Sequence, residues 1–417
     1  MILGKNFFDD QLPTTSFQPL HYVYFHLSTY LMLFVRNRFT WLAYLTTAYF
    51  AYLQAALGPL MPFLRAELGI SYTVGGLHFS AFALGMILAG LVSDCTTQKW
   101  GRSINFWTGA VGMSIGALAL TFSHQVSLTI ISALLLGLLG AILQMTIQAA
   151  LSDQHHAQRT VALTEANVAA SVGASLVPLL IGGFQQIELG WRSALHIGAI
   201  ALILIAIKFR QVAIPASISH QIEVNASYQT LPRTFWIYWV VVFLGVSVEY
   251  CIFFWGADFL EAAVGLTRSH AASAMSVFVM SGFVGRILFS RLSRLVRGEV
   301  LLLSAIAITF LGFPVFWLAT FAPVNILGLL ITGLGVANFY PLILSLALSA
   351  ANTQSDLATA RLSIGVGTAI LISPFLLGWI ADQIELKAAY GLVVLLLAPM
   401  IVLSIVEACF SFGKLQK

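Results

Sequence analysis

Glu249 is the residue whose type and surroundings point most directly to chemistry. It lies in an apolar run that begins near Phe235, and no Lys or Arg lies within one helical turn of it in the sequence. At about 1.5 Å per residue, the run places Glu249 roughly 21 Å along a helix, well inside the hydrocarbon of a membrane. A charged carboxylate at that depth costs about 2.5–3.5 kcal/mol. Such a group pairs with a cation or carries a proton, so proton exchange is the chemistry it predicts.

Amide side chains lie near the middle of three other apolar runs. An unpaired amide is costly in lipid, so each is expected to face protein or a water-filled cavity. Lining a cavity is the favoured interpretation, and interhelical hydrogen bonding is the alternative. These amides are Gln54, Gln144, Gln148 and Asn338.

Aromatic side chains accompany these polar groups. Phe253, Trp255 and Tyr340 are candidates to stack on a ring of a bound molecule, with core or lipid packing as the alternative. Asp258 and Glu261 follow near the end of the Glu249 run, and we expect them to be solvated rim charges.

The composition indicates an integral membrane protein. The chain has 417 residues, 59% hydrophobic and 9% charged, with a mean hydropathy of +0.91. A soluble domain carries about 25% charged residues. The formal charge of +4 does not indicate nucleic acid, because the basic residues lie at the ends of apolar runs. The three cysteines show no metal-ligand spacing and no HExxH, Walker or GxSxG pattern occurs, so we expect no metal, no cofactor and no enzyme.

Twelve apolar segments of spanning length organise the chain. We therefore predict an all-α membrane protein with twelve transmembrane helices in two pseudo-symmetric six-helix bundles. The expected divisions are 1–38, 39–212, a polar linker at 213–234, 235–411 and a tail at 412–417. The segments are 40–63, 75–96, 102–123, 126–150, 161–184, 192–212, 235–260, 268–291, 299–320, 323–350, 357–381 and 386–411.

Basic residues predict the orientation. If the N-terminus is inside, 16 Lys and Arg fall on the cytoplasmic side and 4 outside. We therefore expect a multi-pass protein of the cell (inner) membrane with both termini cytoplasmic. The sequence is compatible with a translation start at Met1 or at Met32.

The two halves repeat. Gly69, Ile70 and Ser71 recur as Gly265, Leu266 and Thr267, an offset of 196 residues. Pro178 with Gly182 recurs as Pro374 with Gly378 at the same offset. Six-helix repeats are typical of transporters that bind their substrate at the midplane between the halves.

The stretch GLVSD from Gly90 to Asp94, followed by Gly101 and Arg102, resembles the loop 2–3 signature of the major facilitator superfamily. The spacing after Asp94 is about four residues longer than usual, one helical turn that an extended helix could absorb. Gly285 with Arg286 resembles the second copy of that signature in loop 8–9. The resemblance implies a gate formed by Gly90, Asp94, Arg102, Gly285 and Arg286, and a central cavity lined by helices 1, 4, 7 and 10.

A weaker resemblance is to the fucose-permease-like sugar/proton symporter branch. It is carried by the stretch GPLMP from Gly58, by the stretch EAN from Glu165, and by Glu249 with Trp255. Members of that branch resemble one another in having acids in helices 1 and 4, where this sequence has Gln54, Gln144 and Gln148.

The expected function is secondary active transport of a small organic solute by alternating access, with proton coupling through Glu249 and a monomer in the bilayer. An exporter of amphipathic compounds is the alternative within transport. A non-transporting membrane receptor or scaffold on the same fold is the alternative of another class.

Overall fold

The computed structural model describes residues 34–216, 231–351 and 354–415. Most of the N-terminal segment, including Met32, most of the predicted linker and the last two residues lie outside this part of the chain. Residues Arg38–Lys417 form one compact unit, separate from the N-terminal residues before it.

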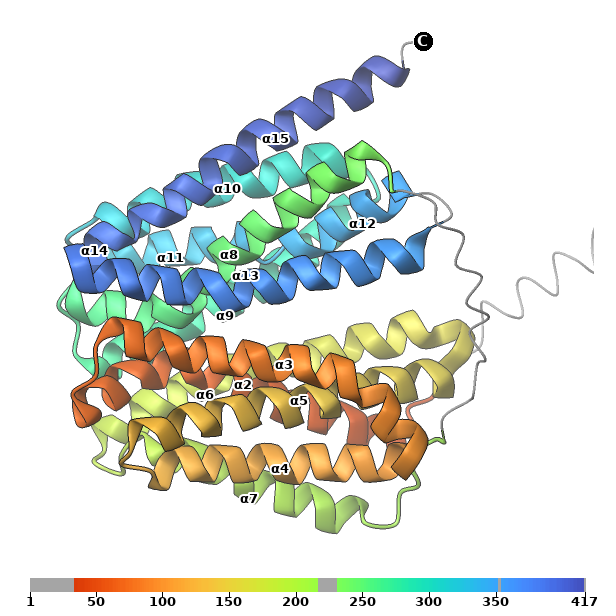
Figure 1. Cartoon of the computed structure of the whole chain (residues 1–417), viewed down its shortest axis with the longest axis vertical. Helices are drawn as coiled ribbons and strands as arrows, with labels where there is room; N and C mark the ends of the chain where they lie inside the picture. The colour runs from red at the N-terminus through yellow and green to blue at the C-terminus, as the bar shows by residue number, and fades with distance from the viewer. Residues whose placement is uncertain (1–33, 217–230, 352–353, 416–417) are drawn as a thin grey trace, which may run out of the picture. The chain divides into compact units, whose positions relative to one another are not determined.

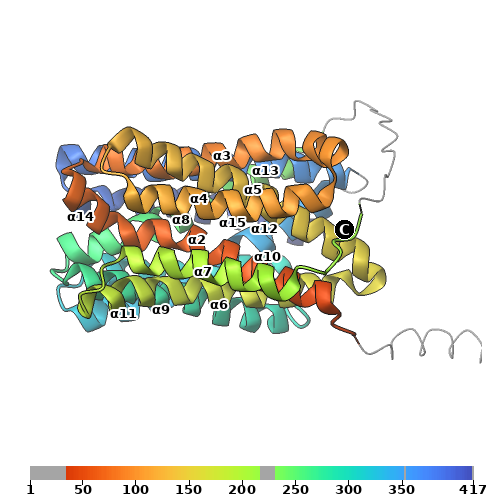
Figure 2. The ribbon, with the colours of Figure 1, turned by 90° about the horizontal axis from the view of Figure 1, so that it is seen from below.

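Every regular element within the described residues is a helix (Figure 1). The first group is α2 (Arg38–Leu68), α3 (Tyr72–Trp100), α4 (Arg102–Phe122), α5 (Val126–His155), the short η1 (His156–Gln158), α6 (Arg159–Gln186) and α7 (Arg192–Phe209). The second group is α8 (Arg233–Ala262), α9 (Arg268–Leu292), α10 (Gly298–Leu318), α11 (Ala322–Val336), α12 (Phe339–Ala351), α13 (Ser355–Ile384), α14 (Leu386–Ala389) and α15 (Gly391–Leu415). Figure 2 shows these helices running side by side along one direction.

Eleven helices among the described residues are long and apolar enough to cross a membrane. One of them, Ala322–Ala351, combines α11 and α12 across a turn at Ala337 and Asn338. The predicted segment 40–63 forms α2, which has 31 residues but is not among the eleven. Its threonines, tyrosines and Gln54 lower its hydropathy, and most of its residues are buried among other helices.

The repeat has the same local structure in both copies. Gly69 and Gly265 have φ of 63° and 82°, a conformation that costs glycine little. Ser71 then caps α3 by accepting from the Val74 N–H, and Thr267 caps α9 by accepting from the His270 N–H. The sequence repeat therefore marks two equivalent helix starts.

The repeated glycines lie where the two groups of helices meet. A Cβ on Gly182 of α6 would collide with Ser269 and Ser273 of α9. A Cβ on Gly378 of α13 would meet the Tyr72 carbonyl oxygen of α3 at 2.6 Å. Small residues let helix backbones approach closely, so α6 packs on α9 and α13 packs on α3 in related ways.

Candidate functional site

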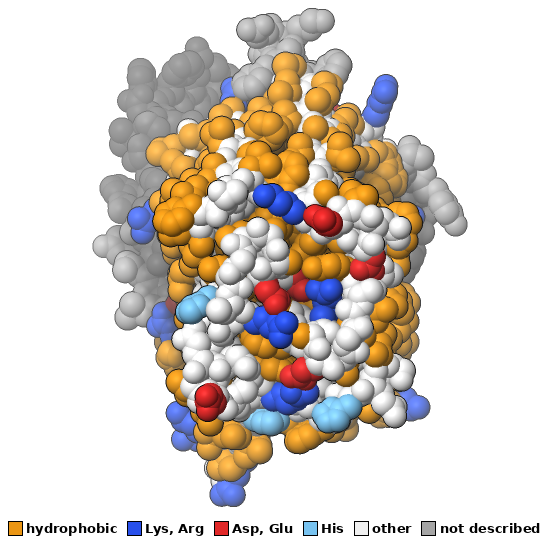
Figure 3. Space-filling model, turned by 90° about the vertical axis from the view of Figure 1, so that its left-hand side faces the viewer, with side chains coloured by type: hydrophobic (Ala, Val, Ile, Leu, Met, Phe, Trp, Pro, Cys, Tyr) orange, Lys and Arg blue, Asp and Glu red, His pale blue; other side chains and the backbone are white. Residues whose placement is uncertain are grey.

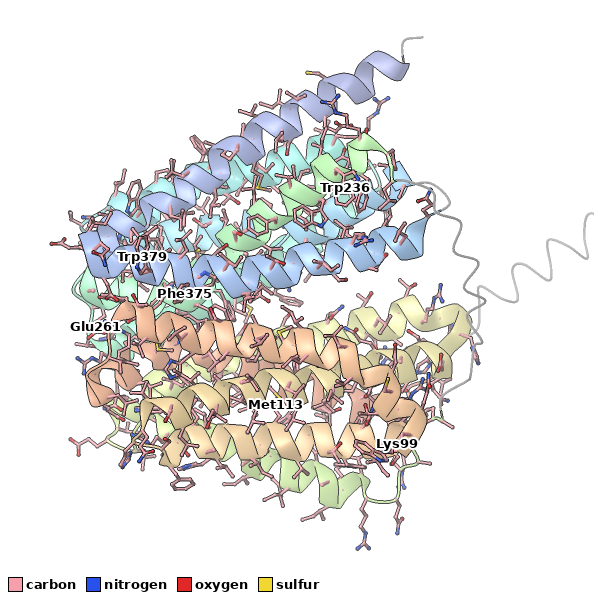
Figure 4. The ribbon with its side chains drawn as sticks, viewed as in Figure 1. Lys99, Met113, Trp236, Glu261, Phe375 and Trp379 are labelled. Atoms are coloured by element: carbon pink, nitrogen blue, oxygen red, sulfur yellow. The ribbon has the colours of Figure 1, made fainter. Side chains whose placement is uncertain are left out.

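The unit has two ends, which are named here by one residue of each. Glu261 and Lys99 lie at opposite ends of the bundle in Figure 4. The end at which α2 and α8 finish and α3 and α9 begin, near Glu261, is the Arg65 end. The end at which α3 finishes, near Lys99, is the Asp94 end.

Glu249 lies within α8, between these ends, with its side chain 21% exposed. Its Oε1 lies 4.0 Å from Nη2 of Arg286 in α9. The sequence pattern had assigned Arg286 to a loop motif, but the residue lies inside α9 (Arg268–Leu292) and faces Glu249. Gly282 and Arg286 are four residues apart and therefore share one helical face. The position of Arg286 within α9 could have been predicted from this spacing.

Arg286 is held at the turn between α11 and α12. Its Nε donates a hydrogen bond of 3.3 Å to the carbonyl oxygen of Ala337. Carbonyls at a helix C-terminus carry partial negative charge, which favours a cation there. Gly285 makes room for this contact, because a Cβ at that position would collide with the Leu334 carbonyl.

A cavity of about 190 Å³ surrounds the Glu249–Arg286 pair. Its walls come from α2, α6, α8, α9 and α11, and they include Gln54, Asn167, Tyr250, Phe253 and Phe278. Gln54, Glu249 and Phe253 had been predicted to line the cavity. Asn167 of α6 had not been singled out, although it follows Glu165 in a motif that the sequence resemblance had highlighted.

A second cavity, of about 530 Å³, lies among α2, α5 and α6. Gln144 and Gln148 line it together with Thr47 and Asn167. Asn167 borders both cavities. The buried Oε1 of Gln144 has no hydrogen-bond partner among the described residues, so it is available to a polar guest.

Three predicted site residues lie elsewhere. Asn338 is buried at the α11–α12 turn, where its Nδ2 donates to the Leu334 carbonyl at 2.8 Å. Trp255 is fully buried, and its Nε1 donates to the Pro374 carbonyl at 2.7 Å. Tyr340 lies on α12 with 37% exposure. The structure does not place these three among the residues that line the Glu249 cavity.

The predicted gate residues of the first half lie at the Asp94 end. α3 continues to Trp100, which confirms that an extended helix absorbs the longer spacing after Asp94. Asp94 and Gly90 are exposed on α3. Arg102 is buried instead, with Nη2 2.8 Å from Oδ2 of Asp153 and Nη1 donating to the Pro215 and Ala216 carbonyls.

The Arg65 end carries the charged contacts that join the two groups of helices. Nη1 of Arg65 in α2 lies 2.7 Å from Oδ1 of Asp258 in α8, and Asp258 is 1% exposed. The prediction that Asp258 is a solvated rim charge was therefore wrong, because α2 covers it. The Arg65 guanidinium also stacks over the ring of Tyr72 at 3.4 Å. Figure 3 shows acidic and basic side chains close together on this face.

Asp382 joins α13 to the start of α3. Its two carboxylate oxygens accept hydrogen bonds from the backbone N–H groups of Tyr72 at 2.9 Å and Thr73 at 2.7 Å. These are free donors of a helix N-terminus, where a carboxylate is favoured. Nearby, Ser80 of α3 donates to the Leu371 carbonyl of α13 at 2.7 Å. Sequence reasoning missed Asp382 because its partners are 309 and 310 residues away.

The two ends therefore differ in this structure. Hydrogen bonds and ion pairs between the α2–α7 group and the α8–α15 group lie on the Arg65 side. At the Asp94 end, the bonds of Arg102 run to Asp153 of its own group and to the chain segment after α7. Among the described residues, no group of three His, Cys, Asp or Glu side chains is placed to hold a metal ion.

Comparison with known proteins gives the family. The model of the Major Facilitator Superfamily matches residues 40–360. The chain belongs to the major facilitator superfamily. It is thus a transporter-type protein that crosses the membrane several times, and not an enzyme.

Relatives of known sequence or structure support this assignment. An uncharacterised MFS-type transporter of Yersinia pestis is 24% identical over 351 residues, which cover 82% of this chain and 89% of that protein. A mutant of the nucleoside transporter NupG has a similar crystal structure, with a TM-score of 0.71, 14% identity, and coverage of 89% of this chain and 99% of that one. A D-xylose–proton symporter gives a TM-score of 0.67 at 13% identity, covering 89% and 96% of the two chains. At these identities, the two crystal structures establish the fold.

Proposed function

We propose that this protein is a secondary active transporter that moves a small organic solute by alternating access, coupled to protons through Glu249. The proposal includes twelve spanning segments, namely α2 and the eleven apolar helices, arranged as two six-helix halves. The symporter among the similar structures is a D-xylose–proton symporter by name, which is compatible with this type of coupling.

The observation that carries the proposal is the position of the Glu249–Arg286 pair. The pair lies in a cavity whose walls come from helices of both groups. Hydrogen bonds and ion pairs between the groups lie on one side of that cavity, at the Arg65 end. A solute bound there is therefore separated from the Arg65 side by paired helices, and rearranging those contacts would change the side of access.

Glu249 is suited to coupling because its environment would change between the two access states. In an occluded cavity, low dielectric disfavours the charged carboxylate, whereas entering water favours it. A group whose proton affinity depends on the access state binds a proton on one side and releases it on the other. Gln54, Gln144 and Asn167 contain amides, which do not titrate in this range.

The orientation of the transporter follows from its basic residues. The excess of Lys and Arg, 16 against 4, supports an orientation with the Asp94 end on the cytoplasmic side. In that orientation, the conformation described above is closed toward the outside. A monomer in the inner membrane with cytoplasmic termini completes the proposal.

The test compares wild-type protein with Glu249→Gln in proteoliposomes that contain a pH-sensitive dye. A panel of sugars, nucleosides and organic acids is screened for solutes that move protons into the vesicles with the wild type. We expect the Gln variant to exchange the same solute in counterflow but to lose proton movement and accumulation. The matched control is Glu261→Gln, on the same helix, whose 2.7 Å pair with Arg268 lies within one group. Wild-type accumulation by Glu249→Gln would refute the coupling role.

A further inference from the structure

We propose that the Glu249 cavity takes up a small organic acid, whose carboxylate binds Arg286 when Glu249 is protonated. The inference rests on the proposed function and adds the chemical class of the substrate. It is carried by the geometry of Arg286 and by the charge of the cavity.

Arg286 presents unused donors to the cavity. Its Nε is engaged by the Ala337 carbonyl, and its side chain is 52% exposed. The 4.0 Å separation between Nη2 and the Glu249 Oε1 exceeds hydrogen-bond distance. Neither terminal nitrogen donates a hydrogen bond to any described residue, so the outer edge of the guanidinium is free. That edge matches the two oxygens of a carboxylate.

The charge of the cavity depends on one proton. Among the residues that line it, Arg286 is the one cation and Glu249 the one anion. The other polar side chains that line the cavity with Glu249 are neutral: Gln54 from α2, Asn167 and Ser171 from α6, and Tyr250 from α8 itself. The Glu249 carboxylate forms an ion pair with Arg286, whose Nη2 lies 4.0 Å from Oε1. The lining is therefore neutral when Glu249 is ionised and has a charge of +1 when it is protonated.

This charge change links anion binding to proton binding. A carboxylate that enters the neutral cavity meets the Glu249 carboxylate near its binding site, which opposes binding. The same carboxylate entering the protonated cavity meets Arg286 without that repulsion. Proton and anion thus bind cooperatively, and each promotes the other by the same factor.

The apolar residues that line the cavity, together with its volume, indicate the size of the acid and the nature of its non-carboxylate part. Phe253 and Phe278 offer apolar ring surface beside the charged pair. The volume of about 190 Å³ lies below the ~300–1,000 Å³ typical of pockets for drug-sized ligands. A small acid with a compact apolar or aromatic body fits these limits.

The experiment measures thermal stabilisation of the purified full-length protein by matched pairs of probes. Each pair is a small acid and its primary amide, such as benzoate with benzamide and lactate with lactamide, at pH 5.5 and pH 7.5. We expect acids, and not their amides, to raise the Tm at pH 5.5. For one linked proton, the Kd of the best acid should rise by about tenfold per pH unit above the titration of Glu249.

Variants separate the roles of the two charged residues. Arg286→Gln should abolish stabilisation by acids, and Glu249→Gln should bind the same acid with a Kd that no longer depends on pH. Arg291→Gln, which removes an exposed arginine from the same helix, should bind like wild type. Binding by Glu249→Gln also shows that a variant of this cavity can fold and bind.

Three results would overturn the inference. These are stabilisation by the amides as strong as by the acids, no stabilisation by any acid of the panel, or full acid binding by Arg286→Gln. If a neutral solute is accumulated with protons through Glu249, the proposed function stands and the inference on substrate class falls. If acids bind through Arg286 but a pH gradient drives no accumulation, the proposed coupling falls and the binding site stands.

Discussion

The Arg65 end and the Asp94 end differ in how the two groups of helices meet. At the Arg65 end, α2 reaches α8 through the Arg65–Asp258 pair, and α13 caps α3 through Asp382. At the Asp94 end, Arg102 binds Asp153 of its own group and the chain segment after α7. Because the halves repeat, they could meet at either end. Under the proposed alternating access, this structure is the state in which the Arg65 end is closed.

The same comparison separates strong contacts from weak ones. Asp258 is almost fully buried, and its Oδ2 has no partner among the described residues. The Asp382 contacts are solvent-exposed hydrogen bonds to a helix start. Breaking a buried pair costs more than removing a helix cap, so the changes below are ordered by that cost.

The largest effect is expected from Arg65→Gln. Removing one partner of a buried ion pair costs about 3–5 kcal/mol, because the other charge is left buried. That cost applies only to the state in which the Arg65 end is closed, so the variant should open this end.

Labelling of a cysteine placed at Ser80 measures that opening, in a protein with Cys95 and Cys409, the exposed cysteines, replaced by serine. Ser80 is half-buried against α13 in the closed end. We expect maleimide to react about tenfold faster or more in Arg65→Gln. Glu261→Gln is the control, and an unchanged rate in Arg65→Gln would show that the pair does not hold this end.

Asp382→Asn should have a smaller effect at the same reporter. Loss of a capping carboxylate costs about 0.5–2 kcal/mol, and an amide oxygen retains part of the interaction with the N–H groups of α3. The rate at which maleimide labels the cysteine at Ser80 should rise a few-fold. The control is Glu385→Gln, which changes a neighbouring exposed acid just after α13. An effect as large as that of Arg65→Gln would contradict the prediction that the Asp382 contacts stabilise the closed end less than the Arg65–Asp258 pair does.

Asp94→Asn should have the smallest effect on the Ser80 reporter. Asp94 is exposed and far from the closed end in this state, so its charge does not stabilise the Arg65 contacts. If Asp94 acts as a latch in the opposite state, the variant should slow turnover while leaving ligand affinity unchanged. A fall in affinity at an unchanged turnover rate would remove the latch hypothesis and indicate a role in binding or folding.

Much of the fold could be predicted from the sequence because spanning helices are local features. The predicted runs 102–123 and 268–291 became Arg102–Phe122 and Arg268–Leu292. Even α2 was predicted from its apolar residues, although its hydroxyl groups lower its hydropathy. The equivalent helix caps Ser71 and Thr267 could be predicted because they belong to the sequence repeat, whose two copies have a constant offset.

The candidate site was harder to predict because it depends on distant contacts. Glu249 could be found from the sequence because a charged carboxylate in a membrane-spanning helix has a high free-energy cost. Its partner Arg286 comes from the next helix and had resembled part of a loop motif. Asp258 lies near a helix end, and only tertiary packing reveals that α2 covers it. Asn338 was predicted from its mid-span position and Trp255 from its aromatic ring. Neither property determines the direction of a side chain around the helix.

Distances between spin labels at both ends test alternating access most directly. One pair joins Leu91 of α3 to Leu357 of α13 at the Asp94 end, and the other joins Phe122 to Phe321 at the Arg65 end, all on exposed positions. In Arg65→Gln, compared with the wild type, we predict that the Phe122–Phe321 distance lengthens while the Leu91–Leu357 distance shortens. Lengthening at both ends, or a change at one end alone, would contradict alternating access between two states.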